Sequence, residues 1–182
     1  MRVVGVIPDV VSFSLAIETC LWTKQWQQTL LLAEEMRVRD VGTNLFCGNA
    51  AISICEQVHK WQEALLFLRD MLGRGLTLPV DTFNSVFRTC QEAGHWQHMP
   101  ELIDEMHIQS VKPDLNSFNS LLSAYERREL WQRAVSLLDI MRMAHVSPDL
   151  VSFDAAISAC EKNGKLQCAS QLQAELYALV SS

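Results

Sequence analysis

Apolar residues recur along the chain with the spacing of one helical face, twice within every 35 residues. In the first kind of segment an aromatic residue is followed by apolar residues four and seven positions later, as at Phe83, Phe87 and Cys90. In the second kind a Trp is followed by apolar residues at helical spacing and by a Met ten positions later, as from Trp61 to Met71. The pattern predicts pairs of antiparallel helices of about 12 residues each.

The pairs repeat at a constant interval. Four tryptophans and four methionines each recur every 35 residues: Trp26, Trp61, Trp96, Trp131, and Met36, Met71, Met106, Met141. A fixed period of this length is typical of a repeat array, in which neighbouring units bury the apolar faces that one hairpin leaves open. We therefore predict an all-α, right-handed superhelical solenoid of about five stacked antiparallel helix pairs, with the methionines in its core.

The register of the repeat sets the predicted units. With the first unit starting at Val10, the units run over residues 10–44, 45–79, 80–114, 115–149 and 150–182, the last of them truncated. Residues 1–9 are interpreted as the remnant of a preceding repeat, because the Pro-Asp pair at their end recurs at residues 113–114 and 148–149.

Two features predict where helices begin. Small polar residues near the start of the first helices are expected to satisfy free backbone N–H groups. These residues are Ser12, Thr82, Ser117 and Ser152. Pro100 falls within the second helix of the third unit, where a deeply placed proline is costly. We expect that helix to start late, near Met99, or to bend.

Composition is that of a folded, non-membrane protein. The chain has 182 residues, of which 49% are hydrophobic and 20% charged, and it has no uninterrupted apolar stretch long enough to span a bilayer. Its first residues do not resemble a signal peptide or an Arg- and Ser-rich transit sequence. Four of the six cysteines share one register of the repeat, and Tyr125 takes that place in the fourth unit: Cys20, Cys55, Cys90 and Cys160. We predict buried thiols there rather than disulfides or metal ligands.

The repeat resembles the pentatricopeptide repeat over essentially the whole chain. The stretches PDLNSFNSLLSAYERRELWQRAVSLLDIM (113–141) and PDLVSFDAAISACEKNGK (148–165) follow that family's pattern of a first helix, an amphipathic second helix and a closing Pro-Asp. The tetratricopeptide repeat fits less well, because the Trp opens the second helix and no Gly-x2-Tyr follows it. The resemblance implies a solenoid that binds single-stranded RNA, with one base per repeat.

In the family, two residues of each unit read the base: the fifth residue and the one that closes the unit. The fifth residues here are Ser14, Asn49, Asn84, Asn119 and Asp154, and the closing residues are Asn44, Pro79, Asp114 and Asp149. Without the family, the simpler interpretation is that Ser and Asn cap the helix starts.

The pairing rule of the family implies a short target. The pairs are Ser14–Asn44 for adenine, Asn84–Asp114 and Asn119–Asp149 for uracil, and Asn49–Pro79 for a pyrimidine. Asp154 has no partner, so the implied core is 5′-A-pyrimidine-U-U-3′. The second residue of each unit is expected to sandwich the bases. Val11, Phe46 and Val151 suit that task, whereas Asp81 and Asn116 are polar departures from it.

Charge argues against tight RNA binding. The formal net charge is −6, whereas most nucleic-acid-binding proteins carry a basic stripe. The resemblance places Arg127 and Lys162 beside phosphates, although a solvated helix end explains them equally well. We therefore expect weak, salt-sensitive binding, or help from flanking repeats or a protein partner.

Catalytic and cofactor chemistry finds little support. His95 and His98 are suitably spaced for a metal, but only Glu101 is near enough in sequence to join them, so we predict no metal and no cofactor. The zinc-deaminase, phosphate-loop and GxSxG motifs are absent, and we expect no enzyme activity from this chain. The competing interpretations are a protein-interaction scaffold and the targeting arm of an RNA-processing enzyme. The family resemblance implies a mitochondrion or plastid as the location and RNA processing, stability or translation as the role.

Overall fold

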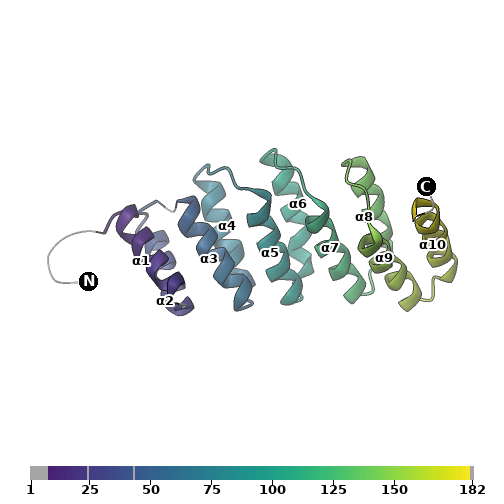
Figure 1. Cartoon of the computed structure of the whole chain (residues 1–182), viewed down its shortest axis with the longest axis horizontal. Coiled ribbons are helices and arrows are strands. Elements are labelled where there is room, and N and C mark those ends of the chain that lie inside the picture. The colour runs from purple at the N-terminus through teal and green to yellow at the C-terminus, as the bar shows by residue number, and fades with distance from the viewer. Residues whose placement is uncertain (1–7, 24, 43, 181–182) are drawn as a thin grey trace. The chain divides into compact units, whose positions relative to one another are not determined.

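The computed structural model describes residues 8–23, 25–42 and 44–180, which form ten α-helices and one short 3₁₀ helix (Figure 1). The first helices of the successive pairs are α1 (Val10–Trp22), α3 (Leu45–Gln57), α5 (Val80–Glu92), α7 (Leu115–Arg127) and α9 (Leu150–Lys162). The second helices are α2 (Trp26–Val38), α4 (Trp61–Gly73), η1 (Trp96–His98) continued by α6 (Met99–Ile108), α8 (Trp131–Met143) and α10 (Leu166–Val180). The described residues contain no strand, so the predicted all-α class is confirmed. None of these helices combines the length and the apolar character that crossing a membrane requires.

The chain divides into two compact bodies, Met1–Thr89 and Cys90–Ser182, with the boundary inside α5. In the N-terminal body α1 packs on α2 and α3, and α3 packs on α2 and α4. In the C-terminal body α9 packs on α7, α8 and α10. Each body contains stacked helix pairs, which confirms the helical-repeat solenoid. The right-handed superhelical course stays a prediction, and most of the proposed remnant at residues 1–9 lies outside the described residues.

The core uses the same places in successive units. The aromatic residues that open the first helices and the methionines of the second helices are all at most 3% exposed: Phe13, Phe83, Phe118, Phe153, Met36, Met71, Met106 and Met141. Gly48 on α3 makes room for Met71, because a Cβ at Gly48 would overlap the Met71 sulfur. The methionine stripe is therefore core packing, as predicted.

The cysteine register is buried in three of the four places where we predicted it. All six cysteines are free thiols. Cys55, Cys90 and Cys160 are fully buried, and burial raises the pKa of the Cys55 thiol to about 12. Cys20 is only half-buried, so the prediction is wrong there. Among the described residues, no helix precedes α1 that could cover Cys20.

Helix starts are capped mainly by the residue before each helix. The side chains of four such residues accept hydrogen bonds from backbone N–H groups in the first turn: Asp9, Asn44, Asp114 and Asp149. Ser117 and Ser152 complete capping boxes by accepting from the N–H of the preceding Asp, as we expected of them. Ser12 instead donates its hydroxyl to Asp9, and Thr82 donates to another helix, so the capping prediction is wrong for these two.

Pro100 delays its helix as predicted. Residues Trp96–His98 form a 3₁₀ turn, and α6 begins at Met99 with Pro100 in its first turn. At that place the missing N–H of proline would have had no partner within the helix. This second helix is accordingly ten residues long, against 13 for α2, α4 and α8.

Candidate nucleic-acid interface

In the N-terminal body, the fifth residue of the first unit touches the residue that closes that unit. The Asn44 amide Nδ2 donates to Ser14 Oγ at 3.0 Å, and Ser14 Oγ donates to the Val10 carbonyl at 2.8 Å. Asn44 Oδ1 accepts from the Cys47 backbone N–H at 2.8 Å, which ties it to the start of α3. The Cys47 sulfur lies 3.2 Å from Ser14 Oγ. The packing of α1 on α3 thus brings together two side chains 30 residues apart in sequence.

In the C-terminal body, the fourth unit has an equivalent contact. The Asn119 amide Nδ2 donates to Asp149 Oδ1 at 3.2 Å. The Ser152 hydroxyl donates to Asn119 Oδ1 at 2.6 Å and also lies 2.8 Å from Asp149 Oδ1. Burial alone would raise the pKa of the Asp149 carboxyl, but its polar contacts with the Ser152 backbone and hydroxyl and with Asn119 outweigh burial and lower the pKa. Asp149 is therefore a carboxylate at neutral pH and acts only as an acceptor.

The second unit is built differently. Its closing residue, Pro79, has no polar side-chain atom and is exposed. The half-buried Asn49 accepts a hydrogen bond at Oδ1 from Thr82 Oγ1, at 2.8 Å. Thr82 lies on α5 and is 5% exposed. The amide of Asn49 is thus held from the following first helix and not by the residue that closes its own unit.

The remaining predicted base-reading residues differ in accessibility. Asn84 is 4% exposed, so a base reaches it only if its surroundings move. Asp114 caps α7, and the pairing of Asn84 with Asp114 stays a prediction because the two residues belong to different bodies. Asp154 is exposed on α9.

The second residues of the units all face solvent. Val11, Phe46 and Val151 are 63%, 47% and 58% exposed, and Asp81 and Asn116 are exposed as well. Each lies three residues before a fifth residue on the same helix, and residues at that spacing share one helical face. Exposed apolar side chains therefore lie beside Ser14, Asn49 and Asp154, which is the arrangement needed for the flat faces of bases to stack on apolar surface.

The two cations predicted to contact phosphates have different surroundings. Arg127 is exposed at the end of α7. Lys162 Nζ lies 2.9 Å from Glu126 Oε1, and the same oxygen accepts from Ser158 Oγ at 2.7 Å. Burial tends to raise the pKa of Glu126, but the hydrogen bonds from Ser158 and Lys162 outweigh it and lower the pKa. Glu126 therefore stays ionised and offsets much of the charge of Lys162.

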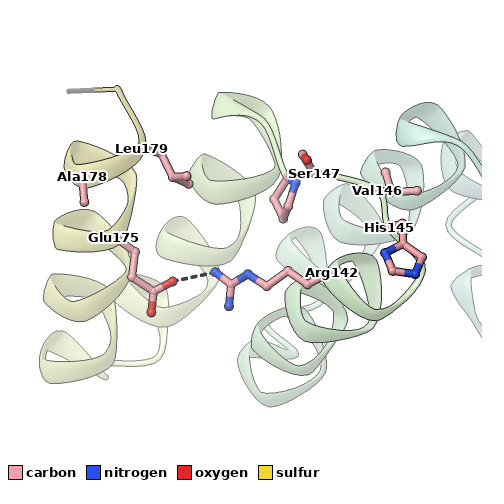
Figure 2. Close-up of a pocket in the computed structure, with 8 residues that line it drawn as sticks. Arg142, His145, Val146, Ser147, Glu175, Ala178 and Leu179 are labelled. Atoms are coloured by element: carbon pink, nitrogen blue, oxygen red, sulfur yellow. Dashed lines mark hydrogen bonds and ion pairs between the residues drawn. The ribbon is translucent and has the colours of Figure 1, made fainter. Parts of the chain in front are cut away.

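A hollow of about 600 Å³ lies elsewhere on the C-terminal body, between α10 and the segment that follows α8 (Figure 2). Across it Arg142 forms an ion pair with Glu175 at 2.6 Å, while Leu179 and Pro148 supply apolar lining. None of the predicted site residues lines this hollow. In the described part of the chain, no three His, Cys, Asp or Glu side chains gather as a metal site would need; His98 Nδ1 lies 3.9 Å from Glu101 Oε2.

Sequence reasoning missed a contact made by the third residue in two of the units. Thr82 and Ser152 were assigned to helix capping alone, but their hydroxyls donate to the fifth residue of the preceding unit. The available signal was a hydroxyl residue at the same place in four of the five units. Its meaning depends on the stacking of helix pairs, which a pattern along one helix does not contain.

The stacked helices of each body and the 35-residue period define a helical-repeat protein built from helix pairs. Two family descriptions match the chain, "Pentatricopeptide repeat domain" over residues 101–175 and "PPR repeat" over residues 49–76. The chain belongs to the pentatricopeptide repeat family. A comparison with curated protein sequences finds no match.

Solved structures with the same fold include proteins bound to RNA. The PPR domain of Arabidopsis thaliana protein-only RNase P 1, in complex with tRNA, is similar with a TM-score of 0.75 at 16% identity, over 90% of this chain and 86% of that one. The pentatricopeptide repeat protein PPR10, in complex with an 18-nt psaJ RNA element, has a TM-score of 0.75 at 24% identity, over 91% of this chain. Nuclear proteinaceous RNase P 2 of A. thaliana has a TM-score of 0.81 at 12% identity, over 93% of this chain. The chain spans 24% of PPR10 and 38% of RNase P 2.

Proposed function

We propose that this chain binds single-stranded RNA with the fifth and closing residues of its units, here called the polar row of the first helices, and with one base for each unit. The observation that carries the proposal is the direct contact between fifth and closing residues, Ser14 with Asn44 and Asn119 with Asp149. The two contacts lie in different bodies and join the residues that the family resemblance pairs for base reading. The RNA-bound relatives of the same fold support the choice of ligand.

The contact in the fourth unit suits uracil. The ionised Asp149 can accept the N3–H of uracil, and the remaining N–H of Asn119 can donate to a uracil carbonyl oxygen. Cytosine carries an acceptor at N3, which a carboxylate repels. A charge-assisted hydrogen bond is roughly twice as strong as a neutral one, so Asp149 is the main source of this preference.

The contact in the first unit suits adenine. Ser14 Oγ accepts from Asn44, and the adenine N6 amino group can replace the weakly donating Cys47 thiol at its second lone pair. The second N–H of the Asn44 amide can donate to adenine N1. Guanine presents the opposite pattern, a carbonyl and an N–H. The exposed Val11 and Phe46 can cover the two faces of this base.

Electrostatics sets the expected strength of binding. Log affinity falls with log salt in proportion to the number of phosphates neutralised, and cations that already have partners add little to that number. Lys162 is paired with Glu126, and the chain carries a net charge of −6. We expect modest affinity that salt weakens, with Arg127 as the better phosphate contact.

Fluorescence anisotropy with short RNAs tests the proposal. The probes contain AUUU or ACUU, at low and moderate salt, with a DNA copy as control. An Asn84→Thr, Asn119→Thr double variant is titrated against RNA with G in place of the last two U. We expect the wild type to prefer the U-containing RNA and the variant to shift toward G. If neither RNA binds better than DNA, RNA is not the ligand.

The role of the bound RNA segment is inferred from the family resemblance. We infer that it protects, masks or presents a transcript segment to other machinery in RNA processing, stability or translation. A mitochondrial or plastid location rests on the family resemblance alone, and one relative of the same fold is described as nuclear.

A protein-interaction scaffold is the second candidate. The observation that favours it is a hollow of about 630 Å³ between α2 and α4, lined by Trp26, Leu31, Leu66 and Phe67. Leu31 and Leu66 are 64% and 47% exposed, away from the polar row of the first helices. Substituting Leu31→Glu should leave RNA affinity unchanged under the main proposal. If the variant loses RNA binding while it stays folded, the hollow and not the polar row is the binding surface.

A further inference from the structure

The third residue of a unit reaches back to the fifth residue of the unit before it. Thr82 Oγ1 donates to Asn49 Oδ1 at 2.8 Å, and Ser152 Oγ donates to Asn119 Oδ1 at 2.6 Å. In both cases the donor follows the acceptor by 33 residues and lies in the first turn of the next first helix. Both hydroxyls are buried, Thr82 at 5% exposure and Ser152 at 0%. The same contact therefore occurs independently in the two bodies.

The buried Thr82 hydroxyl favours one orientation of the Asn49 amide, because in the opposite orientation the hydroxyl hydrogen has no acceptor among the described residues. The oxygen and the NH2 group of an asparagine exchange places by rotation of the side-chain amide, and they offer opposite hydrogen-bonding groups to a base. Asn119 is held from both sides, because its Nδ2 donates to Asp149 while its Oδ1 accepts from Ser152. Only one orientation of the amide satisfies both partners.

The orientation of the Asn49 amide depends on Thr82 alone among the described side chains. Its unit closes with Pro79, whose side chain has no group that can accept from an amide. Among the described residues Thr82 is the one side chain that hydrogen-bonds to Asn49, so both N–H groups of the Asn49 amide are available for a ligand. The hydroxyl of Thr82 makes no capping contact; the backbone N–H of Thr82 bonds to the Pro79 carbonyl at 3.1 Å.

We propose that Thr82 is a positioning residue that holds Asn49 with its N–H groups toward the base, so that the second unit selects cytosine over uracil. This inference rests on the RNA-binding function proposed above. It states which of the two pyrimidines the second unit prefers at the second nucleotide. Cytosine N3 is an acceptor and can receive an Asn49 N–H, whereas uracil N3 carries a hydrogen. In the fourth unit the carboxylate of Asp149 reverses the preference, because it accepts that hydrogen.

The test compares variants that differ in one hydroxyl. Thr82→Val removes the hydroxyl and keeps the shape of a buried side chain. Thr89→Val is the matched control, because Thr89 is also buried on α5 but donates to the Ser85 carbonyl of its own helix, at 2.7 Å. Thr82→Ser restores the donor. Anisotropy titrations with RNAs containing ACUU and AUUU give the ratio of affinities for each protein, and thermal unfolding verifies that each is folded.

We expect the wild type, Thr89→Val and Thr82→Ser to prefer ACUU. Thr82→Val should lower that preference by roughly fivefold, the effect of losing one neutral hydrogen bond, with little change in its affinity for AUUU. If Thr82→Val keeps the full preference, or the wild type binds AUUU as well as ACUU, the role of Thr82 is refuted and RNA binding stands. If the wild type binds neither RNA above DNA, the inference falls together with the proposed function.

Discussion

Asp149 has two roles that substitutions can separate. Its Oδ1 accepts from the Ser152 backbone N–H at 2.9 Å, which caps α9, and from Asn119 Nδ2 at 3.2 Å. In Asp149→Ala both contacts are lost. Loss of the capping side chain costs about 1 kcal/mol, and loss of the bond to the half-buried Asn119 costs about 1 kcal/mol more. The total of about 2 kcal/mol predicts a fall in Tm of about 4–8 °C for a chain of this size.

Asp149→Asn should separate capping from base reading. Asn is as good a capping residue as Asp, so we expect the variant to lose less than about 0.5 kcal/mol of stability. Its uncharged side chain cannot accept the uracil N3–H as strongly. Replacing a charge-assisted hydrogen bond by a neutral one costs roughly 1.4 kcal/mol, which predicts about a tenfold loss of affinity for RNA with U at the fourth nucleotide.

Thermal unfolding by circular dichroism and anisotropy with RNAs that differ at the fourth nucleotide measure the two effects. Asp9→Asn is the matched control, because Asp9 caps α1 in the same way, accepting from the Ser12 N–H at 2.8 Å, but touches no predicted base-reading residue among those described. We expect the control to change neither uracil preference nor Tm appreciably. Full uracil preference in Asp149→Asn, or an unchanged Tm in Asp149→Ala, would refute the reasoning.

Two further predictions concern stability. Gly48→Ala should destabilise the fold by about 1 kcal/mol, because overlap with the buried Met71 outweighs the gain in helix propensity. Gly73→Ala, with no atom within 4 Å of the added Cβ, should stabilise the fold by about 0.5–1 kcal/mol. If urea unfolding gives changes in the free energy of unfolding that have the same sign for both variants, the packing argument is wrong. The pKa of the Cys55 thiol is about 12 in the fold, against about 8.5 unfolded, so its contribution is complete below pH 8.5 and is lost as pH rises toward 12. Urea unfolding between pH 8 and 11 should therefore show a decline that is shallower in Cys55→Ala, and equal slopes would show that this thiol does not contribute.

The repeat and its helices could be predicted from the sequence because they rest on local regularities. Helical periodicity is set within four residues, and the constant spacing of Trp61 and Met71 with their counterparts showed one unit copied without insertions. The late start of α6 followed from the geometry of Pro100 alone. The burial of the methionine stripe followed from the same periodicity, since one face of each second helix has to be covered.

The hydrogen-bonding partners in the polar row were decided by tertiary structure. Asn44 and Ser14 are 30 residues apart, and Thr82 and Asn49 are 33 apart, so they meet only because successive first helices pack side by side. The sequence alone identified candidate polar positions, and the family resemblance supplied their roles, but neither distinguished an amide held by a carboxylate from one held by a threonine hydroxyl. Which group a residue bonds depends on distances of a few ångströms between helices, and those distances are set by the packing of whole units.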